Sequence, residues 1–258
     1  MEREKVSITW LGQMGLMVKL GAATLLIDYF ATDDPGRQTP VPIPADRITG
    51  VDCFLGTHDH LDHIDHAAWK IWAKSCPDAR FLFPSTHTHT VSEDGIPIDR
   101  QRPIDAGKHV TLGSVVIHAI PAAHEFLERD EYGRYPCLQY IIEGEGVRIY
   151  HAGDTLRYEG MLPLLKAFGP MDVALLPING RDGERYRRNC IGNMTFQEAA
   201  DLAGALKPGL VIPGHWDMFA DNTGDPAAFA DYLEAKYRMK CRIPKILEEV
   251  EIACCREE

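Results

Sequence analysis

The chain alternates between short apolar runs and segments rich in glycine, proline and charged residues. Most of the apolar runs are only as long as a β-strand and are rich in β-branched or aromatic residues. They lie within residues 6–30, 51–57, 79–85, 107–124, 137–154, 171–180 and 210–219. Two of these regions contain a tight-turn sequence, at Gly113-Ser114 and at 144–146, and are expected to form β-hairpins. The segment 31–48, rich in proline and aspartate, is expected to be a long loop.

Other segments have the apolar spacing of amphipathic helices, namely residues 65–75, 159–169, 195–208 and 225–237. The third begins with Thr195 and has Glu198 three residues later, a pairing typical of a capping box. Strands come first, then strands alternate with helices, and several strands end in loops that contain histidine or aspartate. This order predicts an α/β (α+β) protein in which sheets pack on each other, helices cover them and a site forms where strand ends converge.

Composition narrows the class of protein. The 258 residues suffice for a well-buried core, and a content of 45% hydrophobic and 25% charged residues is typical of a globular protein. A formal net charge of -11 argues against broad binding to nucleic acid or to an anionic membrane surface. It does not exclude a small anionic substrate, and it leaves the formation of a homo-oligomer open.

The sequence also indicates a cellular compartment. We expect no secretory signal in the charged start of the chain, and no uninterrupted apolar segment approaches the length of a transmembrane helix. The cysteines are scattered and lack the paired spacing of a cysteine-based zinc site; they stand at positions 53, 76, 137, 190, 241, 254 and 255. We therefore expect reduced thiols and a cytoplasmic protein, with no role for the adjacent Cys254 and Cys255.

The densest group of polar residues is the segment FLGTHDHLDHIDH, residues 54–66. His58 and His60 are two positions apart, so both imidazoles can point the same way from an extended segment. Asp62 and His63 follow immediately and can face a second ion nearby. Imidazole together with carboxylate suits zinc, iron or manganese. Each residue alone would more often be a helix cap or a surface group, but the whole array predicts metal ligation.

One short segment cannot fill two coordination shells, so further ligands are expected at other strand ends. His124, Asp154 and His215 each follow an apolar, strand-like run and precede a loop. An aspartate in such a set can bridge two cations about 3.5–4 Å apart. Asp28, also at a strand end, and His151 are expected to support the ligands rather than to bind metal.

These residues carry a resemblance to a known family. The segment THDHLDH resembles the signature of the metallo-β-lactamase superfamily, and the later His124, Asp154 and His215 match its remaining ligand motifs in order. Five segments resemble the L-ascorbate 6-phosphate lactonase branch; they are ITWLGQMGLMVKL…LLIDYF, THDHLDHID, IYHAGDT, DVALLPING and LVIPGHWDMF. The resemblance covers almost the whole chain. The segment between His124 and Cys137 departs from it, which bears on the substrate rather than on the metal site.

The resemblance implies a single domain over residues 1–258 with a four-layer αββα sandwich and two divalent cations at one edge of the sheets. It implies that His58, His60 and His124 hold the first cation. It implies that Asp62, His63 and His215 hold the second, and that Asp154 bridges the two. Relatives in the lactonase branch favour manganese, whereas the wider superfamily uses zinc or iron.

Two such cations can lower the pKa of a shared water to near neutrality and so provide a hydroxide that attacks a carbonyl. The sequence therefore predicts a hydrolase that opens a lactone, with a phosphorylated sugar lactone such as L-ascorbate 6-phosphate as one candidate. Asp62, Asp154 and His215 are the predicted catalytic residues, with Asp62 also a proton shuttle. The alternatives are a metal-dependent phosphodiesterase or nuclease, and a non-catalytic metal-binding protein on the same scaffold.

A second polar segment, NGRDGERYRRN at residues 179–189, gathers four arginines in an otherwise acidic chain. Because arginine binds phosphate and carboxylate in a bidentate manner, Arg181 and Arg185 are predicted to bind an anionic small-molecule substrate. The competing interpretation is a solvated loop in which these arginines balance Asp182 and Glu184. Trp216, next to a predicted ligand, is a candidate wall of the substrate pocket.

Overall fold

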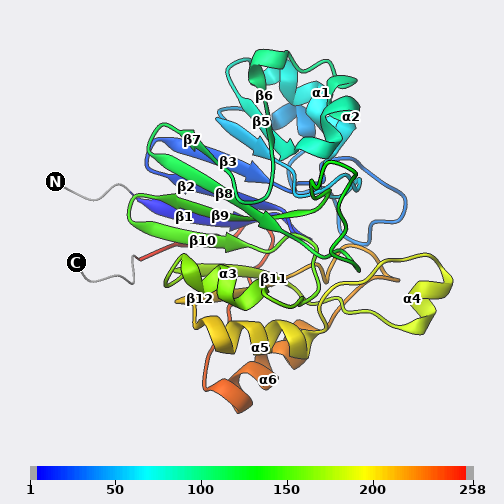
Figure 1. The fold of residues 1–258 in the computed structure, drawn as a ribbon, viewed down its shortest axis with the longest axis vertical. Coiled ribbons are helices and arrows are strands. Elements are labelled where there is room, and N and C mark those ends of the chain that lie inside the picture. The colour runs from blue at the N-terminus through cyan, green and yellow to red at the C-terminus, as the bar shows by residue number, and fades with distance from the viewer. Residues whose placement is uncertain (1–4, 254–258) are drawn as a thin grey trace.

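The computed structural model describes residues 5–253, which form two stacked sheets (Figure 1). The first sheet has the strand order β13 (Glu249–Glu251), β1 (Val6–Trp10), β2 (Leu16–Leu20), β3 (Ala23–Ile27), β4 (Cys53–Leu55), β5 (Arg80–Pro84) and β6 (Gln101–Ile104). The second has the order β12 (Leu210–Gly214), β11 (Val173–Pro177), β10 (Val147–His151), β9 (Leu138–Gly144), β8 (Val115–Pro121) and β7 (His109–Leu112). The hairpins β7–β8 and β9–β10 turn at the two predicted positions.

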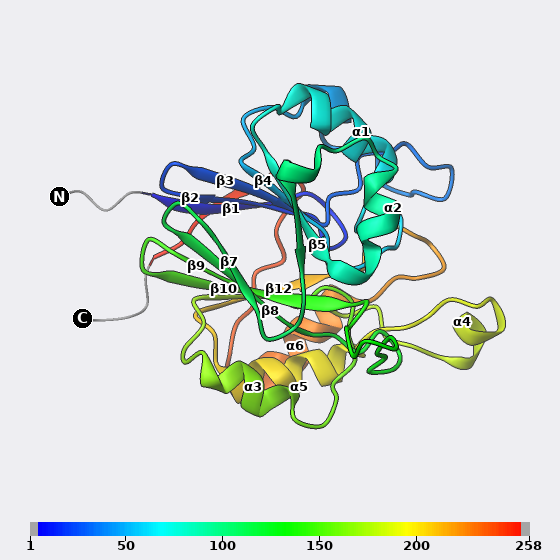
Figure 2. The ribbon, with the colours of Figure 1, turned by 45° about the horizontal axis from the view of Figure 1, so that its top comes forward.

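Helices cover the outer faces of both sheets and complete four layers (Figure 2). Helices α1 (His66–Ser75) and α2 (Thr88–Ser92) lie on the side of the first sheet, and α3 (Met161–Ala167), α5 (Phe196–Leu206) and α6 (Pro226–Tyr237) lie on the second. Single 3-10 turns occur at η1 (Ala45–Arg47), η2 (Ser85–His87) and η3 (Ile98–Arg100). The predicted αββα sandwich is confirmed.

Strand alternation explains why the layers stay together. In β3, Leu25 and Ile27 face the core between the two sheets, whereas Leu26 faces the core under α1. Successive side chains of a strand point to opposite faces, so a strand that is apolar at every position must be covered on both sides. Trp69 and Trp72 of α1 supply that cover and are almost fully buried.

Several local predictions can now be compared with the structure. Thr195 and Glu198 form the expected capping box, with both reciprocal hydrogen bonds present. The segment 179–189 was expected to be a loop, but it contains the short helix α4 (Gly183–Arg187), whose N-cap Asp182 accepts two backbone hydrogen bonds. Strand β13 and helix α2 were not predicted. A helix of five residues leaves too short a periodic pattern to be recognised.

Two expectations from the sequence, that no segment spans a membrane and that the thiols are reduced, can be compared with the structure of residues 5–253. None of the helices among residues 5–253 combines the length and hydrophobicity needed to cross a membrane. Within the same residues the cysteines are unpaired thiols, at positions 53, 76, 137, 190 and 241. Cys254 and Cys255 lie outside the described residues.

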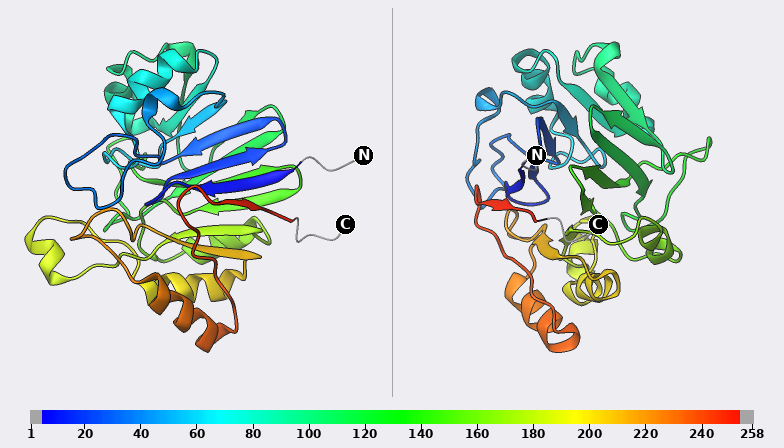
Figure 3. Two further views of the ribbon diagram at one scale, coloured as in Figure 1. Left: turned by 180° about the vertical axis from the view of Figure 1, so that it is seen from behind. Right: turned by 90° about the vertical axis from the view of Figure 1, so that its left-hand side faces the viewer.

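The topology brings the polar strand ends to one edge of the sandwich. Strands β3, β4, β5 and β6 run parallel, as do β10, β11 and β12, so their carboxyl ends meet at the same side. The start of β1 and the end of β13 lie at the opposite side (Figure 3). Gly153, just after β10, has a φ of +54°, and a Cβ atom there would lie 2.9 Å from the Thr57 side chain. Glycine is therefore needed where the loop after β10 approaches the loop after β4.

Candidate metal centre

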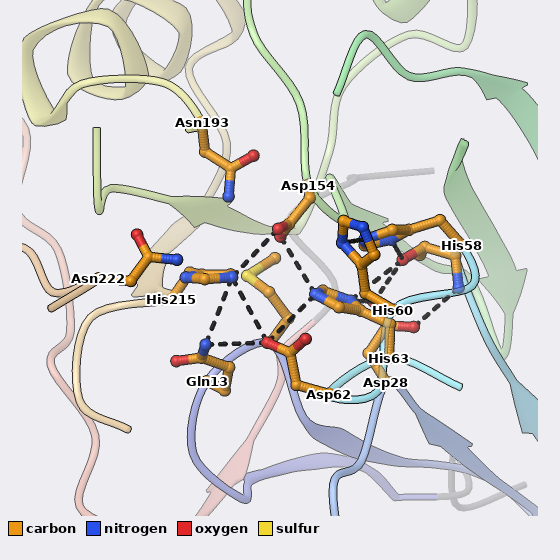
Figure 4. A network of polar contacts seen from close by, with 12 residues as sticks. Gln13, Asp28, His58, His60, Asp62, His63, Asp154, Asn193, His215 and Asn222 are labelled. Atoms are coloured by element: carbon orange, nitrogen blue, oxygen red, sulfur yellow. Dashed lines mark hydrogen bonds and ion pairs between the residues drawn. The ribbon is translucent and has the colours of Figure 1, made fainter. Parts of the chain in front are cut away.

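The seven predicted ligands meet at this edge, and Figure 4 labels all of them except His124. Four come from the loop between β4 and α1, and one each from the segments after β8, β10 and β12. Their donor atoms form three groups with all atoms of a group within 4.8 Å of one another: His58, His60 and His124; His58, His63 and Asp154; Asp62, His63 and His215. Residues that are up to 157 positions apart in the sequence are thus placed around one point by the strand order.

The first group contains three imidazoles edge to edge. His58 Nε2 lies 2.9 Å from His60 Nδ1, which in turn lies 3.2 Å from His124 Nε2. Zinc–nitrogen bonds of 2.0–2.1 Å in a tetrahedron imply nitrogen–nitrogen separations of about 3.3 Å. Three imidazoles at such distances satisfy one another poorly, because each neutral ring has only one N–H to donate. The spacing fits a shared cation.

The set Asp62, His63 and His215, called the second group below, mixes imidazoles with a carboxylate and lies beside Asp154. His215 Nε2 lies 3.6 Å from Asp62 Oδ2 and 3.1 Å from Asp154 Oδ2, and His63 Nε2 lies 3.4 Å from Asp154 Oδ1. Asp154 Oδ2 is also 3.7 Å from His124 Nε2, a member of the first group. Asp154 is therefore the residue that touches both groups, as expected of a bridging carboxylate.

Several polar atoms at this edge are buried without a hydrogen-bond partner, which supports the same interpretation. They include His63 Nε2 and Asp154 Oδ1, whose residues are 1% and 3% exposed. A buried polar atom without a partner costs free energy unless a water or an ion satisfies it. The donor set of imidazole nitrogens and carboxylate oxygens is the one that zinc, iron and manganese accept.

Burial and neighbouring charges set the protonation of the two groups in opposite directions. Burial lowers the pKa of His124 to about 4, and burial with neighbouring imidazoles lowers the pKa of His58 and His60. These three rings are neutral at neutral pH, the form that binds metal. Burial also disfavours a charged His63, but Asp154, Asp62 and Asp28 outweigh it and raise the pKa of His63 well above its usual value. The carboxylates around His63 thus stabilise positive charge, which a cation would supply.

Asp28 and Thr57 hold the ligand rings in place. His63 Nδ1 lies 2.7 Å from Asp28 Oδ2, and Thr57 Oγ1 donates to the same carboxylate at 2.7 Å. Asp28 was predicted to support His60 or His63, and the contact is with His63. A carboxylate on the far nitrogen fixes the tautomer and leaves Nε2 free for a metal. His151 is buried but contacts the Met14 carbonyl and the Gly153 amide, so it shapes the turn before Asp154.

Backbone conformation also marks the site. Asp28 has a φ of 45° and His215 a φ of 57°, in the left-handed region that non-glycine residues rarely adopt. Such residues cost about 1–3 kcal/mol each and persist only where the surroundings hold them. At both positions the unusual backbone places a side chain against the cluster.

The sequence did not identify Gln13, Asn193 or Asn222 as site residues. Gln13 is 1% exposed, and its Nε2 donates to Asp62 Oδ2 at 3.0 Å. Asn193 donates to Asn179, which donates to Asn222 at 2.8 Å, and Asn222 lines the cleft beside His215. The only signal for Gln13 was its position in a glycine-flanked turn, and the asparagines stood in loops without a metal-binding pattern.

A cleft of about 300 Å³ opens onto the cluster. Besides candidate ligands, its lining is apolar or uncharged: Leu61, Asn189, Cys190, Ile191, Phe219 and Asn222. Neither Arg181 nor Arg185 lines it. Arg181 forms a bidentate pair with Glu198 at 2.6 and 2.8 Å. Arg185 donates to Asp182 at 3.0 Å and to the Thr223 carbonyl at 2.7 Å, so the structure places both arginines in internal pairs.

Trp216 lies on another side of the chain segment that carries His215. It stacks on Trp10, with ring centroids 5.3 Å apart, and lines a separate cavity of about 730 Å³. Its indole Nε1 donates to the Pro213 carbonyl at 3.1 Å. The residue therefore packs behind the cluster, and the structure does not bring it into the cleft.

A second histidine–aspartate group lies beside the first, at the start of α1. His66 Nε2 is 2.7 Å from Asp59 Oδ1, and His66 Nδ1 is 2.6 Å from the buried Asp94. The hydrogen bonds that Asp59 and Asp94 accept from His66, the Asp59 bond contributing most, raise the pKa of His66 to about 9. His66, Asp59 and Asp94 are called the His66 cluster below. Asp65, the N-cap of α1, accepts from Ala68 N and so begins the helix as predicted.

Comparison with known proteins identifies the family of this chain. The model of the beta-lactamase superfamily domain matches residues 25–216. A UPF0173 metal-dependent hydrolase of Thermococcus kodakarensis is 31% identical over 87% of this chain and 90% of its own. A UPF0173 metal-dependent hydrolase of Pyrobaculum aerophilum is 30% identical over 93% of this chain and 97% of its own.

Solved structures show the same fold. Igni18, described as a metallo hydrolase from Ignicoccus hospitalis, has a TM-score of 0.75 at 24% identity and covers 96% of this chain and 98% of its own. An isothiocyanate hydrolase from Delia radicum gut bacteria has a TM-score of 0.74 at 17% identity, over 95% and 98% of the two chains. The family model spans most of the sequence, and the relatives match over nearly their full length. The chain therefore belongs to the metallo-β-lactamase superfamily, among its metal-dependent hydrolases.

Proposed function

We propose that this metal-dependent hydrolase opens a lactone or a comparable small ester with the help of two divalent cations. The observation that carries the proposal is Asp154, whose carboxylate contacts both groups of donor atoms at the floor of the cleft. His58, His60 and His124 would hold one cation, and Asp62, His63 and His215 the other. When bound, such a pair lowers the pKa of a water molecule and polarises a carbonyl oxygen.

The protein's own side chains orient the reaction. Asp62 Oδ2 contacts Gln13, His63 and His215, whereas among residues 5–253 Asp62 Oδ1 takes part in no side-chain hydrogen bond or ion pair. We assign to Asp62 Oδ1 the proton released when water adds to the carbonyl carbon. The same proton then goes to the ring oxygen that leaves as the ester C–O bond breaks, so the product is a hydroxy acid. Asp154 and His215 stay fixed by their mutual contact.

The cleft supports an uncharged substrate rather than a phosphorylated one. Apart from the candidate ligands, its lining offers amides and apolar side chains. The two arginines that were predicted to bind an anion, Arg181 and Arg185, are paired with Glu198 and Asp182. A phosphate group away from the cations would find no arginine or lysine in this lining with which to form a charge-assisted hydrogen bond. The resemblance of five sequence segments to lactonases supports the lactone itself.

The test is a substrate panel on chelator-stripped protein supplied with manganese, zinc or iron. The panel contains an unsubstituted γ-lactone, a phosphorylated sugar lactone, p-nitrophenyl acetate, bis-p-nitrophenyl phosphate and a thioester. We expect metal-dependent hydrolysis of the uncharged lactone or ester to be fastest. Faster cleavage of the phosphodiester would assign the site to a phosphodiesterase. Metal uptake without hydrolysis of any substrate would assign the chain to the non-catalytic metal-binding alternative, and no metal uptake would refute the two-cation site.

A further inference from the structure

Gln13 is held rigidly in the turn between β1 and β2. Its backbone N–H donates to Asp217 Oδ1 at 2.7 Å. Its carbonyl accepts from Trp10 Nε1 at 3.1 Å and from the backbone N–H of His215 at 3.0 Å. Its φ of 54° lies in the left-handed region, so the turn imposes strain on this residue. Three polar contacts and an unfavourable backbone thus fix the direction of the side chain.

That side chain points into the second group of predicted ligands (Figure 4). Gln13 Nε2 lies 3.0 Å from Asp62 Oδ2 and 3.3 Å from His215 Nε2. The other end of the amide, Gln13 Oε1, is buried and has no hydrogen-bond partner. A fully buried glutamine that leaves its acceptor unsatisfied loses about 1–3 kcal/mol relative to a satisfied one.

The contact with His215 conflicts with the proposed cation site. His215 Nε2 lies 3.6 Å from Asp62 Oδ2 and 3.1 Å from Asp154 Oδ2, so it is the nitrogen of this ring that would face a cation. A single lone pair cannot both accept a hydrogen bond from Gln13 and bind a cation. Exchanging the oxygen and nitrogen of a glutamine amide moves no heavy atom appreciably, and the exchange turns Oε1 toward Asp62 and His215. Amide oxygens are good ligands for manganese and other hard cations.

We propose that the side-chain oxygen of Gln13 is a further ligand of the cation held by Asp62, His63 and His215. The inference rests on the two-cation site proposed above and adds a residue from the turn between β1 and β2 to it. The competing role is a donor only, in which Gln13 Nε2 holds Asp62 in position and never touches the cation. The two roles make opposite demands on the residue at position 13, because a ligand must offer an oxygen and a donor must offer an N–H.

Two substitutions separate these roles. Gln13→Glu keeps an oxygen of similar reach but has no N–H for Asp62, and it places a second carboxylate beside Asp62. Gln13→Leu has a similar volume and offers neither group. Calorimetric titration of Mn²⁺ into the chelator-stripped protein gives the number of cations and the affinity of each. We expect two cations in the wild type, a second site weakened about 10- to 100-fold in Gln13→Leu, and affinity within about threefold of wild type or tighter in Gln13→Glu.

The donor-only role predicts the reverse order, with Gln13→Glu binding more weakly than Gln13→Leu, and that order would overturn the proposal. Wild-type affinity in Gln13→Leu, together with a wild-type absorption spectrum of its Co²⁺-loaded form, would overturn it as well. Gln197→Glu, on the exposed side of α5, is the control for one added negative charge and should bind two cations like the wild type. The visible absorption of the Co²⁺-loaded protein provides a second readout, because loss of a ligand changes band intensity even if affinity is unchanged. A wild type that binds only one cation would refute the two-cation site itself, whatever position 13 does.

Discussion

The segment between β4 and α1 supplies histidine and aspartate to two adjacent clusters that have opposite characters. In the candidate metal centre, imidazoles crowd one another and several buried polar atoms have no hydrogen-bond partner. In the His66 cluster, both nitrogens of His66 reach a carboxylate at 2.6–2.7 Å. Residue type is the same in both places. What distinguishes them is whether the protein satisfies the polar atoms itself.

This difference separates a site from a structural clamp. A cluster whose members satisfy one another's hydrogen bonds stabilises the fold and gains little from a ligand. A cluster that leaves donors and acceptors open is costly until a cation or substrate completes it. The two clusters are therefore expected to respond differently to the same kinds of substitution, and this expectation can be tested residue by residue.

The largest effect is expected when the shared carboxylate of the metal centre is removed. Asp154→Asn eliminates one negative charge that contacts both donor groups. We expect a loss of at least about 10³-fold in kcat/KM on the best substrate of the panel, roughly 4 kcal/mol of transition-state stabilisation, and fewer than two bound cations by elemental analysis.

The matched variant is Asp94→Asn in the His66 cluster, which makes the same chemical change at a residue that is 6% exposed. It should keep both cations and most of the activity while losing stability. If both variants lost the cations equally, the distinction between an open and a closed cluster would be wrong.

The next largest effect is expected at Asp28, which holds the predicted ligand His63 in position. Asp28→Asn keeps the shape of the side chain but weakens its hold on His63 Nδ1, which lies 2.7 Å away. Removing such a supporting carboxylate typically costs 10- to 100-fold in metal affinity. Competition with a calibrated zinc or manganese chelator measures this loss. An unchanged affinity would show that Thr57 and the other neighbours alone orient His63.

These contacts show how much of the site was within reach of the sequence. The four ligands after β4 share one short motif, and His124, Asp154 and His215 each end an apolar run, so strand topology alone predicts that they converge. Asp28 was found by the same reasoning. Gln13 was not, because a glutamine between glycines has no pattern of its own, and its role depends on Asp62 and His215, which are remote in sequence.

The fold shows a similar division. Strand-length apolar runs and capped helices predicted packed sheets covered by helices, because period and capping are local properties. The four-layer αββα arrangement was implied by the resemblance to the metallo-β-lactamase superfamily. Helix α4 and strand β13 were missed, since five and three residues are too few for a periodic signal. The sequence also did not reveal the partner of Arg181, one of the two arginines predicted to bind substrate. Arg181 finds its partner in Glu198, which the sequence had already assigned to the capping box of α5.

A smaller effect, confined to stability, is expected in the His66 cluster. The pKa of His66 is raised to about 9 in the folded protein, against 6.5 for an unperturbed histidine. Its stabilisation is therefore fully present below pH 6.5 and is lost as the pH rises through about 9. We expect His66→Gln to reduce the free energy of unfolding by about 2 kcal/mol at pH 6 and by much less at pH 10, after allowance for solvent exposure.

Urea denaturation of the stripped wild type and His66→Gln at both pH values measures the difference. Both proteins contain the same metal-centre histidines, whose own titration cancels in the comparison. A difference that grew with pH would contradict the assignment of a charged His66.

The smallest effect is expected at Arg181. The sequence predicted that its side chain is available to bind substrate, whereas the structure pairs it with Glu198. Its guanidinium forms two hydrogen bonds with Glu198, and both side chains are about one-third exposed, at 29% and 34%. Partly exposed pairs of this kind contribute about 0.2–1 kcal/mol, so Arg181→Gln should lower the free energy of unfolding by no more than that. KM for a phosphorylated sugar lactone should not change, because Arg181 does not line the cleft. A rise in KM of tenfold or more for the phosphorylated lactone, with no change for the unsubstituted one, would instead show that Arg181 leaves Glu198 to bind substrate. In that case, pairing with another residue of the protein would not be enough to distinguish a structural residue from one that binds substrate.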